Sequence, residues 1–356
     1  MNKCTYNLEN AEVLDVLRQL DEISQRNLTE CTDHLIEVLK CEERDIVREA
    51  IVETLKRLDD ESIPDKIVEL FESDEAFLRN SAVTILSHRW QMPLESLSKS
   101  LRNENKHVRK LALDALHSLG NPIAVDIIAL ALDDEDINNV IAAVEYIGDL
   151  EGYKYAEKIV KIMSESEDPF LTATCLEALG KVGNKYLADV VQRMFPDPLK
   201  LEDFILAPYL KFVAAFGNTS HINMILEVGR SKLKLFCKEI VDAIQNIVQR
   251  EASNLLPESK QRLHDFLDWA LDQDVPSNNK YEMVLLIADI GAGKVSDLVK
   301  RLLLSADPLV RLGAIEVVGQ LKMREFAKDL EILLKAESNE DVRYVIEDVL
   351  NQLTGR

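Results

Sequence analysis

One short segment of the chain carries glycines and a lysine at a spacing that could bind phosphate. Gly291, Gly293 and Lys294 stand in "ADIGAGKVSDLV", residues 288–299. A phosphate-binding loop needs a further glycine five residues before the Gly-Lys pair and a Ser or Thr after the lysine, but those positions hold Ala288 and Val295. The preceding residues also have the pattern of an amphipathic helix rather than a buried strand. We therefore expect no nucleotide site here.

Histidines are the next residues that could do chemistry, because clustered imidazoles and carboxylates ligate transition metals. The chain has six histidines, and none is followed by Glu; even the pair His264-Asp265 stands alone. A catalytic or metal site needs convergent partners, so a lone histidine on a helix is expected to be structural or exposed. We expect no metal, no cofactor and no catalytic residue.

The cysteines likewise predict neither a metal site nor a disulfide framework. They form no C-x-x-C pair, and their number is odd, which argues against a disulfide framework and against a zinc ribbon. A reducing, cytoplasmic location fits this usage best. The five are Cys4, Cys31, Cys41, Cys175 and Cys237.

The charge of the chain bears on its partners. The 42 basic and 63 acidic residues give a formal net charge of −21, which repels nucleic acid and anionic lipid. Two basic clusters, at Lys99–Lys110 and Arg230–Lys238, are interpreted as solvated helix faces, with a binding patch as the alternative. The N-terminus lacks the apolar core of a secretion signal, and no apolar run is long enough to insert in a membrane. We expect a soluble protein.

A sequence repeat extends over nearly the whole chain and includes the glycine-lysine segment. Segments such as "DPLVRLGAIEVVGQL" (307–321) share an acidic or amide cap, an apolar residue and often an arginine. Apolar residues follow three and seven places after this anchor position, which is the spacing of one helix face. Successive anchors lie 28 to 46 residues apart. They are Arg48, Arg79, Arg109, Val140, Thr172, Tyr209, Cys237, Met283, Arg311 and Arg343.

A second amphipathic segment precedes each anchor, so each unit is predicted to be a helical hairpin. Pro64, Pro93 and Pro122 stand where a first helical turn accepts proline. Glycines fall at or just past the end of the second helix, where a left-handed backbone would favour them. These glycines are Gly120, Gly148, Gly180, Gly217, Gly291 and Gly319.

The repeat predicts an all-α fold, a right-handed α-solenoid (superhelix) of about ten helical hairpins with capping helices. We expect an N-terminal capping helix within residues 1–28, centred on 10–24, and one continuous solenoid domain over residues 29–356. The extra residues of the longest interval are expected in longer helices around 236–251 and 258–272.

The motif resembles HEAT repeats, specifically the short bacterial subclass first described in phycobilisome lyases. "DPLVRLGAIEVVG" and "TATCLEALGKVGN" carry the resemblance, and weaker copies extend from about residue 30. The resemblance implies an α-solenoid but no particular activity, because such repeats serve scaffolds, adaptors, lyases, a hydroxylase and DNA glycosylases. The paired His-Glu dipeptides of the hydroxylase are absent, and the acidic charge does not fit the glycosylases. A lyase handling a bilin or another tetrapyrrole stays as the enzymatic alternative.

The second helices of such hairpins usually line the concave face, where a partner would bind. Five places after the anchor the chain has mostly carboxylates, interpreted either as an anionic ladder for a basic partner or as ion pairs between hairpins. One place after the anchor the rear half has apolar side chains, interpreted either as a docking groove or as packing between hairpins. The ladder comprises Glu53, Asp114, Glu145, Glu177, Asp242, Glu316 and Asp348; the candidate groove comprises Leu210, Val284, Leu312 and Tyr344, with Glu316 and Asp348.

The sequence therefore predicts a non-catalytic cytoplasmic scaffold or adaptor that binds another protein on its concave face, without nucleic acid or membrane insertion. The alternative is the lyase-like handling of a tetrapyrrole on a partner protein.

Overall fold

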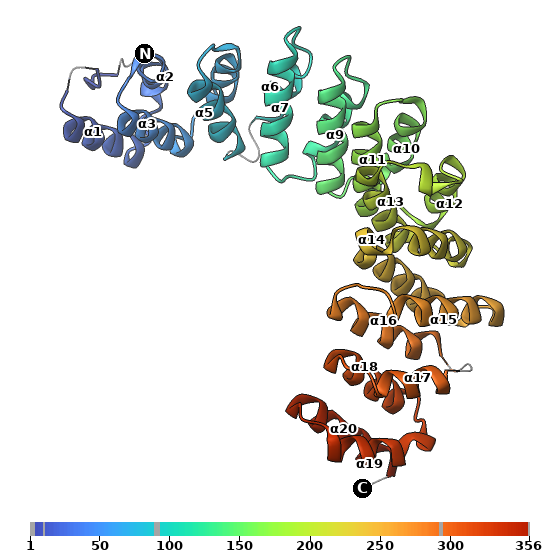
Figure 1. The fold of residues 1–356 in the computed structure, drawn as a ribbon. Coiled ribbons are helices and arrows are strands. Elements are labelled where there is room, and N and C mark those ends of the chain that lie inside the picture. Colours follow the sequence, from blue (N-terminus) through green and yellow to red (C-terminus); the bar gives the residue numbers. More distant parts are fainter. Residues whose placement is uncertain (1–3, 10, 89–92, 292–294, 355–356) are drawn as a thin grey trace. The chain divides into compact units, whose positions relative to one another are not determined.

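A computed structural model describes residues 4–9, 11–88, 93–291 and 295–354, and every regular element among them is helical (Figure 1). The all-α prediction is confirmed. The chain divides into two compact units, Met1–Ile159 and Val160–Arg356, with the boundary inside helix α10 (Ala156–Glu165). The prediction of one continuous domain stays a prediction.

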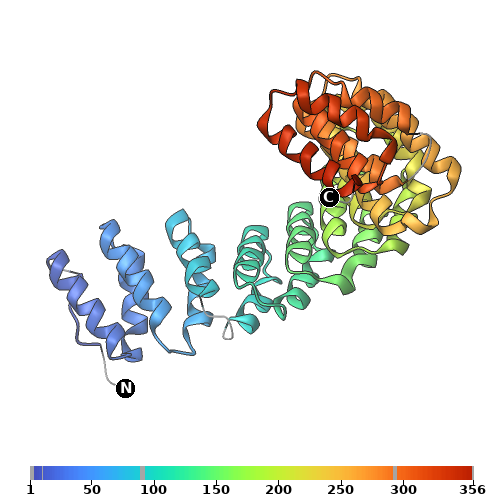
Figure 2. The ribbon, with the colours of Figure 1, turned by 90° about the horizontal axis from the view of Figure 1, so that it is seen from below.

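The first unit consists of helical hairpins stacked in chain order. The second helix of each hairpin packs on the next, α3 on α5, α5 on α7 and α7 on α9, and Figure 2 shows these helices side by side. Some first helices are short and continue as a 3₁₀ turn. The helices are α2 (Thr32–Cys41), α3 (Asp45–Arg57), α4 (Ile63–Ile67, continued over Val68–Glu72), α5 (Ala76–Ser87), α6 (Leu94–Ser100), α7 (Lys106–Ser118), α8 (Ala124–Ile128, continued over Ala129–Asp133) and α9 (Ile137–Asp149).

The N-terminal helix α1 (Val13–Gln25) packs on α3 as α3 packs on α5. It therefore takes the place of a second helix at the end of this row. The described residues of the segment before it are not helical. Its Leu8 side chain is fully buried, and Arg44 donates hydrogen bonds to the carbonyls of Ala11 (2.9 Å) and Leu8 (3.3 Å).

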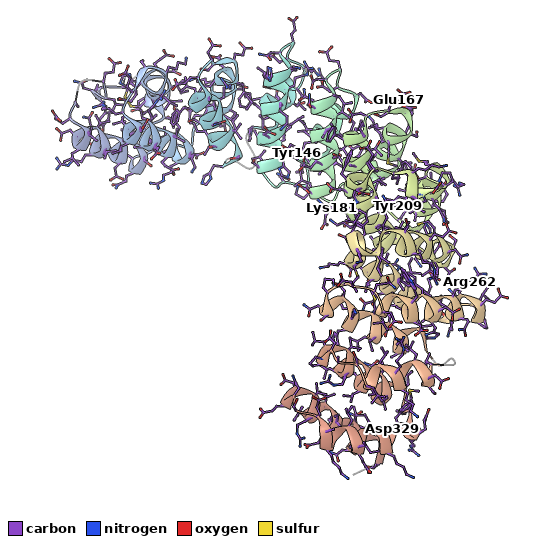
Figure 3. The ribbon with its side chains drawn as sticks, viewed as in Figure 1. Tyr146, Glu167, Lys181, Tyr209, Arg262 and Asp329 are labelled. Atoms are coloured by element: carbon purple, nitrogen blue, oxygen red, sulfur yellow. A yellow bond between two sulfur atoms is a disulfide. The ribbon has the colours of Figure 1, made fainter. Side chains whose placement is uncertain are left out.

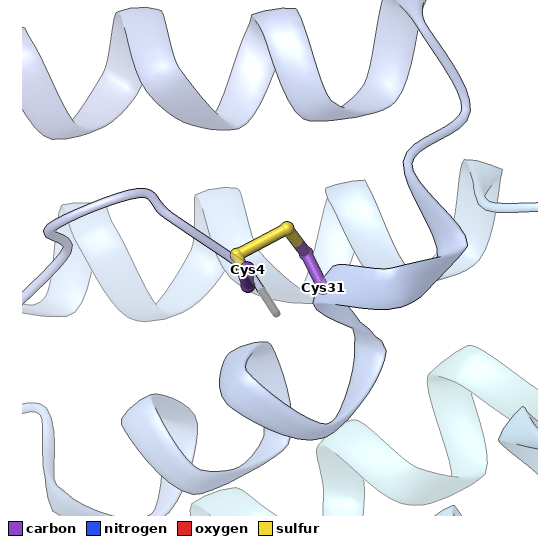
Figure 4. Close-up of a disulfide and its surroundings, with 2 residues drawn as sticks. All are labelled: Cys4 and Cys31. Carbon is purple, nitrogen blue, oxygen red and sulfur yellow. A yellow bond between two sulfur atoms is a disulfide. The ribbon is translucent and has the colours of Figure 1, made fainter. Parts of the chain in front are cut away.

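A disulfide between Cys4 and Cys31 also fixes this segment, with the two Cα atoms 4.8 Å apart (Figure 4). The sequence argument against disulfides was wrong for this pair, because the number and spacing of cysteines do not reveal which segments the fold brings together. The other cysteines are free thiols, Cys41 exposed and Cys175 and Cys237 buried.

The second unit continues the same arrangement. Its second helices pack in the order α11, α13, α14, α16, α18 and α20. With the first unit, the described residues form the ten hairpins that the repeat predicts. The helices are α11 (Pro169–Val182), α12 (Lys185–Met194), α13 (Asp203–Phe216), α14 (Ile222–Glu251), α15 (Pro257–Leu271), α16 (Ser277–Ile290), α17 (Ser296–Leu303), α18 (Pro308–Gln320), α19 (Ala327–Ala336) and α20 (Glu340–Thr354).

Helix α14 differs from the other elements because it forms both halves of one hairpin. It runs for 30 residues, with non-helical backbone at Lys232 (φ −127°) and Phe236 (φ −123°). The bend lies in the basic segment Arg230–Lys238, so this segment is not the continuous helix face that the charge pattern suggested. The predicted long helices around 236–251 and 258–272 are present as the second half of α14 and as α15.

Side-chain caps explain why the second helices begin where they do. Asn105, Asp136, Asp168 and Asp307 each accept a hydrogen bond from a backbone N–H of the first turn, at 2.8 to 3.0 Å. These bonds satisfy donors that a helix start otherwise leaves unpaired. The acidic or amide position of the repeat is thus the helix N-cap.

The glycine prediction is only partly correct. Gly120 and Gly291 have positive φ values of +60° and +87° at helix ends, and Gly217 follows α13 with an extended backbone. Gly148, Gly180 and Gly319 lie within their helices instead. After α9 and α18 the left-handed residues are Glu151 and Lys322, so non-glycine residues make two of these turns.

Candidate functional site

Two of the repeat arginines, Arg109 and Arg311, each join their hairpin to the next by a bidentate ion pair. Arg109 on α7 is buried, and its NH1 atom donates to the carbonyls of Asn103 (2.9 Å) and Glu104 (3.1 Å), which end the preceding turn. Its Nε and NH2 atoms bond both oxygens of Asp134, each at 2.8 Å, in the following hairpin. A bidentate pair of this kind is strong and directional. The side chain therefore joins hairpins and is unavailable to a partner.

Arg311 on α18 repeats this geometry in the second unit. Its NH1 atom donates to the carbonyls of Ser305 (2.8 Å) and Ala306 (3.1 Å), and its Nε and NH2 atoms bond Glu337 at 2.7 and 2.8 Å. The Arg311 guanidinium, aided by backbone N–H groups, lowers the pKa of the buried Glu337 carboxyl. The arginine of the repeat is thus a structural residue in both units.

Two of the predicted partner-binding residues are buried. Leu210 on α13 and Val284 on α16 each have 0% exposed surface. A Cβ atom placed on Gly313 of α18 would lie 3.1 Å from Val284 Cγ1, so the absent side chain of this glycine lets the two helices approach closely. For Leu210 and Val284 the groove prediction was wrong and the alternative, packing between hairpins, holds.

The other four predicted residues lie on neighbouring helices, and we call them the α18–α20 strip: Leu312 and Glu316 on α18, and Tyr344 and Asp348 on α20. Tyr344 is 74% exposed, Asp348 is exposed, and Leu312 and Glu316 are half-buried. The Tyr281 hydroxyl on α16 donates to Glu316 at 2.8 Å. Burial and this bond to a carboxylate raise the pKa of Tyr281 to about 12. The strip therefore combines an exposed tyrosine with two carboxylates.

The first unit contains a polar cluster, the α7–α9 cluster, that the sequence analysis recognised only in part. Tyr146 on α9 (Figure 3) donates to Asp114 at 2.5 Å, and its ring stacks on His117, with centroids 4.0 Å apart. Lys110 pairs with Asp114, and His117 lies 3.2 Å from Asp149. Burial and the Asp114 carboxylate raise the pKa of Tyr146, so the phenol stays protonated at neutral pH. The cluster is held by mutual bonds rather than organised around an activated nucleophile.

Repeat alignment placed Lys110 and Asp114 on this face but could not find the stack. His117 and Tyr146 occupy different offsets from their anchors, eight and six residues after Arg109 and Val140. The sequence signal that could have predicted this stack is the presence of two aromatic rings on adjacent second helices, each about two turns after its anchor.

The remaining carboxylates of the predicted ladder do not form one class. Glu53 is exposed and pairs with Lys56 of its own helix at 2.6 Å, whereas Asp242 is half-buried. Glu145 and Glu177 are exposed. Because Lys56 lies on the same helix, this pair is not an ion pair between hairpins, and both interpretations of the ladder stay predictions.

The glycine-lysine segment follows helix α16, so the strand that a phosphate loop would follow is not there. Gly291 ends this helix with its N–H bonded to the carbonyl of Ile287 at 3.3 Å. Gly293 and Lys294 lie outside the described residues. The expected absence of a nucleotide site therefore stays a prediction.

Candidate metal ligands do not converge in the part of the chain that the structure describes, where no group of three His, Cys, Asp or Glu side chains could hold an ion. His264 is 6% exposed, and within the described residues neither of its ring nitrogens has a hydrogen-bond partner. Burial lowers the pKa of His264. Among the described residues, no helix is both long and apolar enough to cross a bilayer.

Comparison with known proteins agrees with this architecture. Residues 265–351, which begin within α15 and end within α20, match the family described as HEAT repeats. No curated protein matches the chain. The fold is that of a HEAT-repeat solenoid.

Three solved solenoids illustrate the likeness. The chain is similar to a structure in which Kap95p binds RanGDP (TM-score 0.65, 12% identity), to importin beta (0.51, 12%) and to Kap121p bound to Ste12p (0.58, 13%). Each alignment covers 97% of this chain but only 56%, 62% and 44% of the respective structures. The chain thus spans about half the length of these proteins, and at this identity the likeness concerns the fold alone.

Proposed function

We propose that the chain is a non-catalytic scaffold or adaptor that binds another protein on its second helices, with the α18–α20 strip as part of the surface. The observation that carries the proposal is Tyr344, which is 74% exposed on α20 while Val342 and Ile346 of the same helix are buried. Two of the similar solenoids were solved in studies of protein partners, RanGDP and Ste12p. Their likeness supports a protein ligand over a small-molecule substrate.

The composition of the strip suits a particular kind of partner. Exposed tyrosines are frequent anchors in protein interfaces because a rigid ring contributes a large contact area. Asp348 and Glu316 add negative charge beside it. A partner segment with an apolar side chain flanked by Lys or Arg would complement this surface. The net charge of −21 disfavours phosphate backbones, so we propose no nucleic acid as a partner. The cytoplasmic location stays a prediction, because the Cys4–Cys31 disulfide removes the cysteine argument for it.

The test is quantitative affinity capture from the native cell with the double variant Tyr344→Ala/Asp348→Lys. Both side chains are exposed, so the variant is expected to melt within about 2 °C of the wild type, as surface changes usually do. Proteins that bind the strip should fall at least tenfold in abundance.

A matched control keeps the same types of change on another helix. Glu331→Lys/Ile332→Ala alters two exposed residues of α19. It should capture the same proteins as the wild type. Equal capture by the wild type and by a folded Tyr344→Ala/Asp348→Lys variant would remove the strip from the proposal.

The resemblance to phycobilisome-lyase-like repeats supports the alternative, a protein that handles a bilin or another tetrapyrrole on its partner. Incubation of the purified protein with bilins or haem distinguishes the two functions. A red-shifted, saturable absorbance band would favour the tetrapyrrole, and an unchanged ligand spectrum would favour the scaffold.

A further inference from the structure

Arg79 on α5 departs from the pairing that Arg48, Arg109 and Arg311 make with the following hairpin. Arg48 pairs with Glu75 at 2.5 Å, and Arg109 and Arg311 each bind a carboxylate bidentately. Among the described residues, Arg79 makes no ion pair. The reason lies in the residue six places before the next anchor, which is Asn103 where the equivalent positions hold Asp134 and Glu337.

The Arg79 guanidinium nevertheless lies in the same orientation as its counterparts. Its NH1 atom donates to the carbonyls of Ser73 and Asp74, each at 2.8 Å. Arg109 and Arg311 make the same two bonds to the residues six and five places before them. In those two arginines, Nε and NH2 hold the carboxylate. In Arg79 these two donors have no acceptor within the described part of the chain.

Asn103 keeps the local role of a carboxylate but not its charge. Its Oδ1 atom accepts from the N–H of Asn105 at 2.8 Å, as Asp134 Oδ1 accepts from the N–H of Asp136 at 2.8 Å. Its amide Nδ2 atom donates to Glu72 at 3.0 Å. A carboxylate has two acceptor oxygens for a bidentate pair with an arginine, whereas the second atom of this amide is a donor and cannot accept from Arg79.

The guanidinium borders a cavity of about 410 Å³ between the second and third hairpins. Phe71 and Leu111 give this cavity an apolar part, and His107 and Lys110 contribute to its polar lining together with Arg79. The volume is sufficient for a side chain of another protein. Arg79 itself is half-buried, so a bond made there is better shielded from water than one on an open surface.

We propose that Arg79 binds a carboxylate of a partner protein, an Asp or Glu side chain flanked by an apolar residue, in this cavity. The fork geometry of guanidinium matches a carboxylate, and two other arginines of this chain show that match. A phosphate is disfavoured relative to a carboxylate because Glu72 and Asp74, which also line the cavity, repel a doubly charged anion more strongly than a singly charged one. Lys110, which could offset that charge, is already paired with Asp114. This site lies in the first unit and is independent of the α18–α20 strip.

Asn103→Asp tests the proposal by supplying the carboxylate from the chain itself. The introduced carboxylate should bond Arg79 as Asp134 bonds Arg109 and so occupy the fork, at the cost of the bond from Asn103 to Glu72. Asn80→Asp is the matched control, because it adds the same charge next to Arg79 in the sequence but outside the repeat acceptor position.

The readout is the side-chain Nε–H signal of Arg79 in NMR spectra of the full chain, assigned with Arg79→Lys. The probe is the acetylated, amidated tripeptide Leu-Glu-Leu, and its Gln counterpart is the reference. We expect a saturable shift with the Glu peptide, at least tenfold weaker binding of the Gln peptide and of inorganic phosphate, loss of binding in Asn103→Asp and retention in Asn80→Asp.

Three results would overturn the proposal: no saturable shift with the Glu peptide, equal binding by a folded Asn103→Asp variant, or tighter binding of phosphate than of the peptide. If Asn103→Asp does not fold, Arg79→Lys provides the same comparison by peptide titration in the calorimeter, because lysine keeps the charge but lacks the fork. Undiminished affinity in Arg79→Lys would equally refute a guanidinium site.

Discussion

Replacing Glu337 by alanine is expected to release the last hairpin, α19–α20, from the rest of the second unit. The carboxylate accepts four hydrogen bonds: two from Arg311 at 2.7 and 2.8 Å, and one each from the N–H groups of Ser338 and Asn339, both at 3.0 Å. Removing one partner of a buried ion pair costs about 3–5 kcal/mol. We take about 3 kcal/mol, the lower end of this range, since the Arg311 side chain is 14% exposed and water can reach it.

We expect this cost to fall first on the α19–α20 hairpin, because α20 packs on α18 and α19 and hairpins of a solenoid contact mainly their neighbours. A loss of about 3 kcal/mol corresponds to roughly a hundredfold change in an opening equilibrium. Hydrogen exchange followed by mass spectrometry should therefore show α20 amides exchanging about a hundredfold faster in Glu337→Ala, with α11 and α13 unchanged. Glu331→Ala, an exposed change on α19, should leave all of these rates as in the wild type.

The effect should also depend on pH. The pKa of Glu337 is lowered below 4.5, chiefly by its bond to Arg311. The carboxylate therefore stabilises the fold above the unfolded pKa, and this contribution disappears as the pH falls through the lowered folded value. The difference between wild type and Glu337→Ala should shrink below about pH 4. Unchanged α20 exchange at pH 7, or equal acceleration throughout the second unit, would refute the reasoning.

Three further substitutions test packing and protonation. Gly229→Ala would place a Cβ atom 2.6 Å from Cζ of the fully buried Phe266, and it should lower the free energy of unfolding in urea by about 1–3 kcal/mol. In Gly180→Ala the nearest neighbour of the new Cβ is the Cα atom of Phe212 at 4.0 Å, so this variant should gain about 0.5–1 kcal/mol. The opposite order of stabilities would contradict the close approach at Gly229. His264→Phe should reduce the loss of stability that accompanies acidification below about pH 6.5. Burial lowers the pKa of His264 in the folded state, so the unfolded chain binds the proton first and is favoured as the pH falls. Parallel curves of stability against pH for the wild type and the variant would contradict this assignment.

The hairpins were predictable because their pattern is local. The anchors all lie in second helices, and the segments upstream form the first helices, since a repeated apolar face specifies both. The turn glycines were less predictable. Gly120 and Gly291 adopt positive φ, yet Glu151 and Lys322 reach the same region in other turns, so a glycine near a helix end is not required to form the turn.

The candidate surface was predicted less well because exposure depends on the neighbouring helix. Val284 and Tyr344 occupy the same repeat position, but Val284 packs beside Gly313 while Tyr344 lies on the last helix of the described chain. A position within one hairpin does not contain this information. The pairing of Cys4 with Cys31 depends likewise on a non-helical segment that has no repeat pattern.

The bonds of the repeat arginines also determine which piece of this chain could be exchanged intact. Arg311 lies on α18, but its carboxylate partner, Glu337, follows α19. A graft that begins with the first helix of a hairpin and ends with the second would separate these two residues. A graft from Ser305 to Glu337 keeps the arginine, its two carbonyl acceptors and its carboxylate together. For recombination, the transferable module of this chain is therefore a second helix with the first helix that follows it.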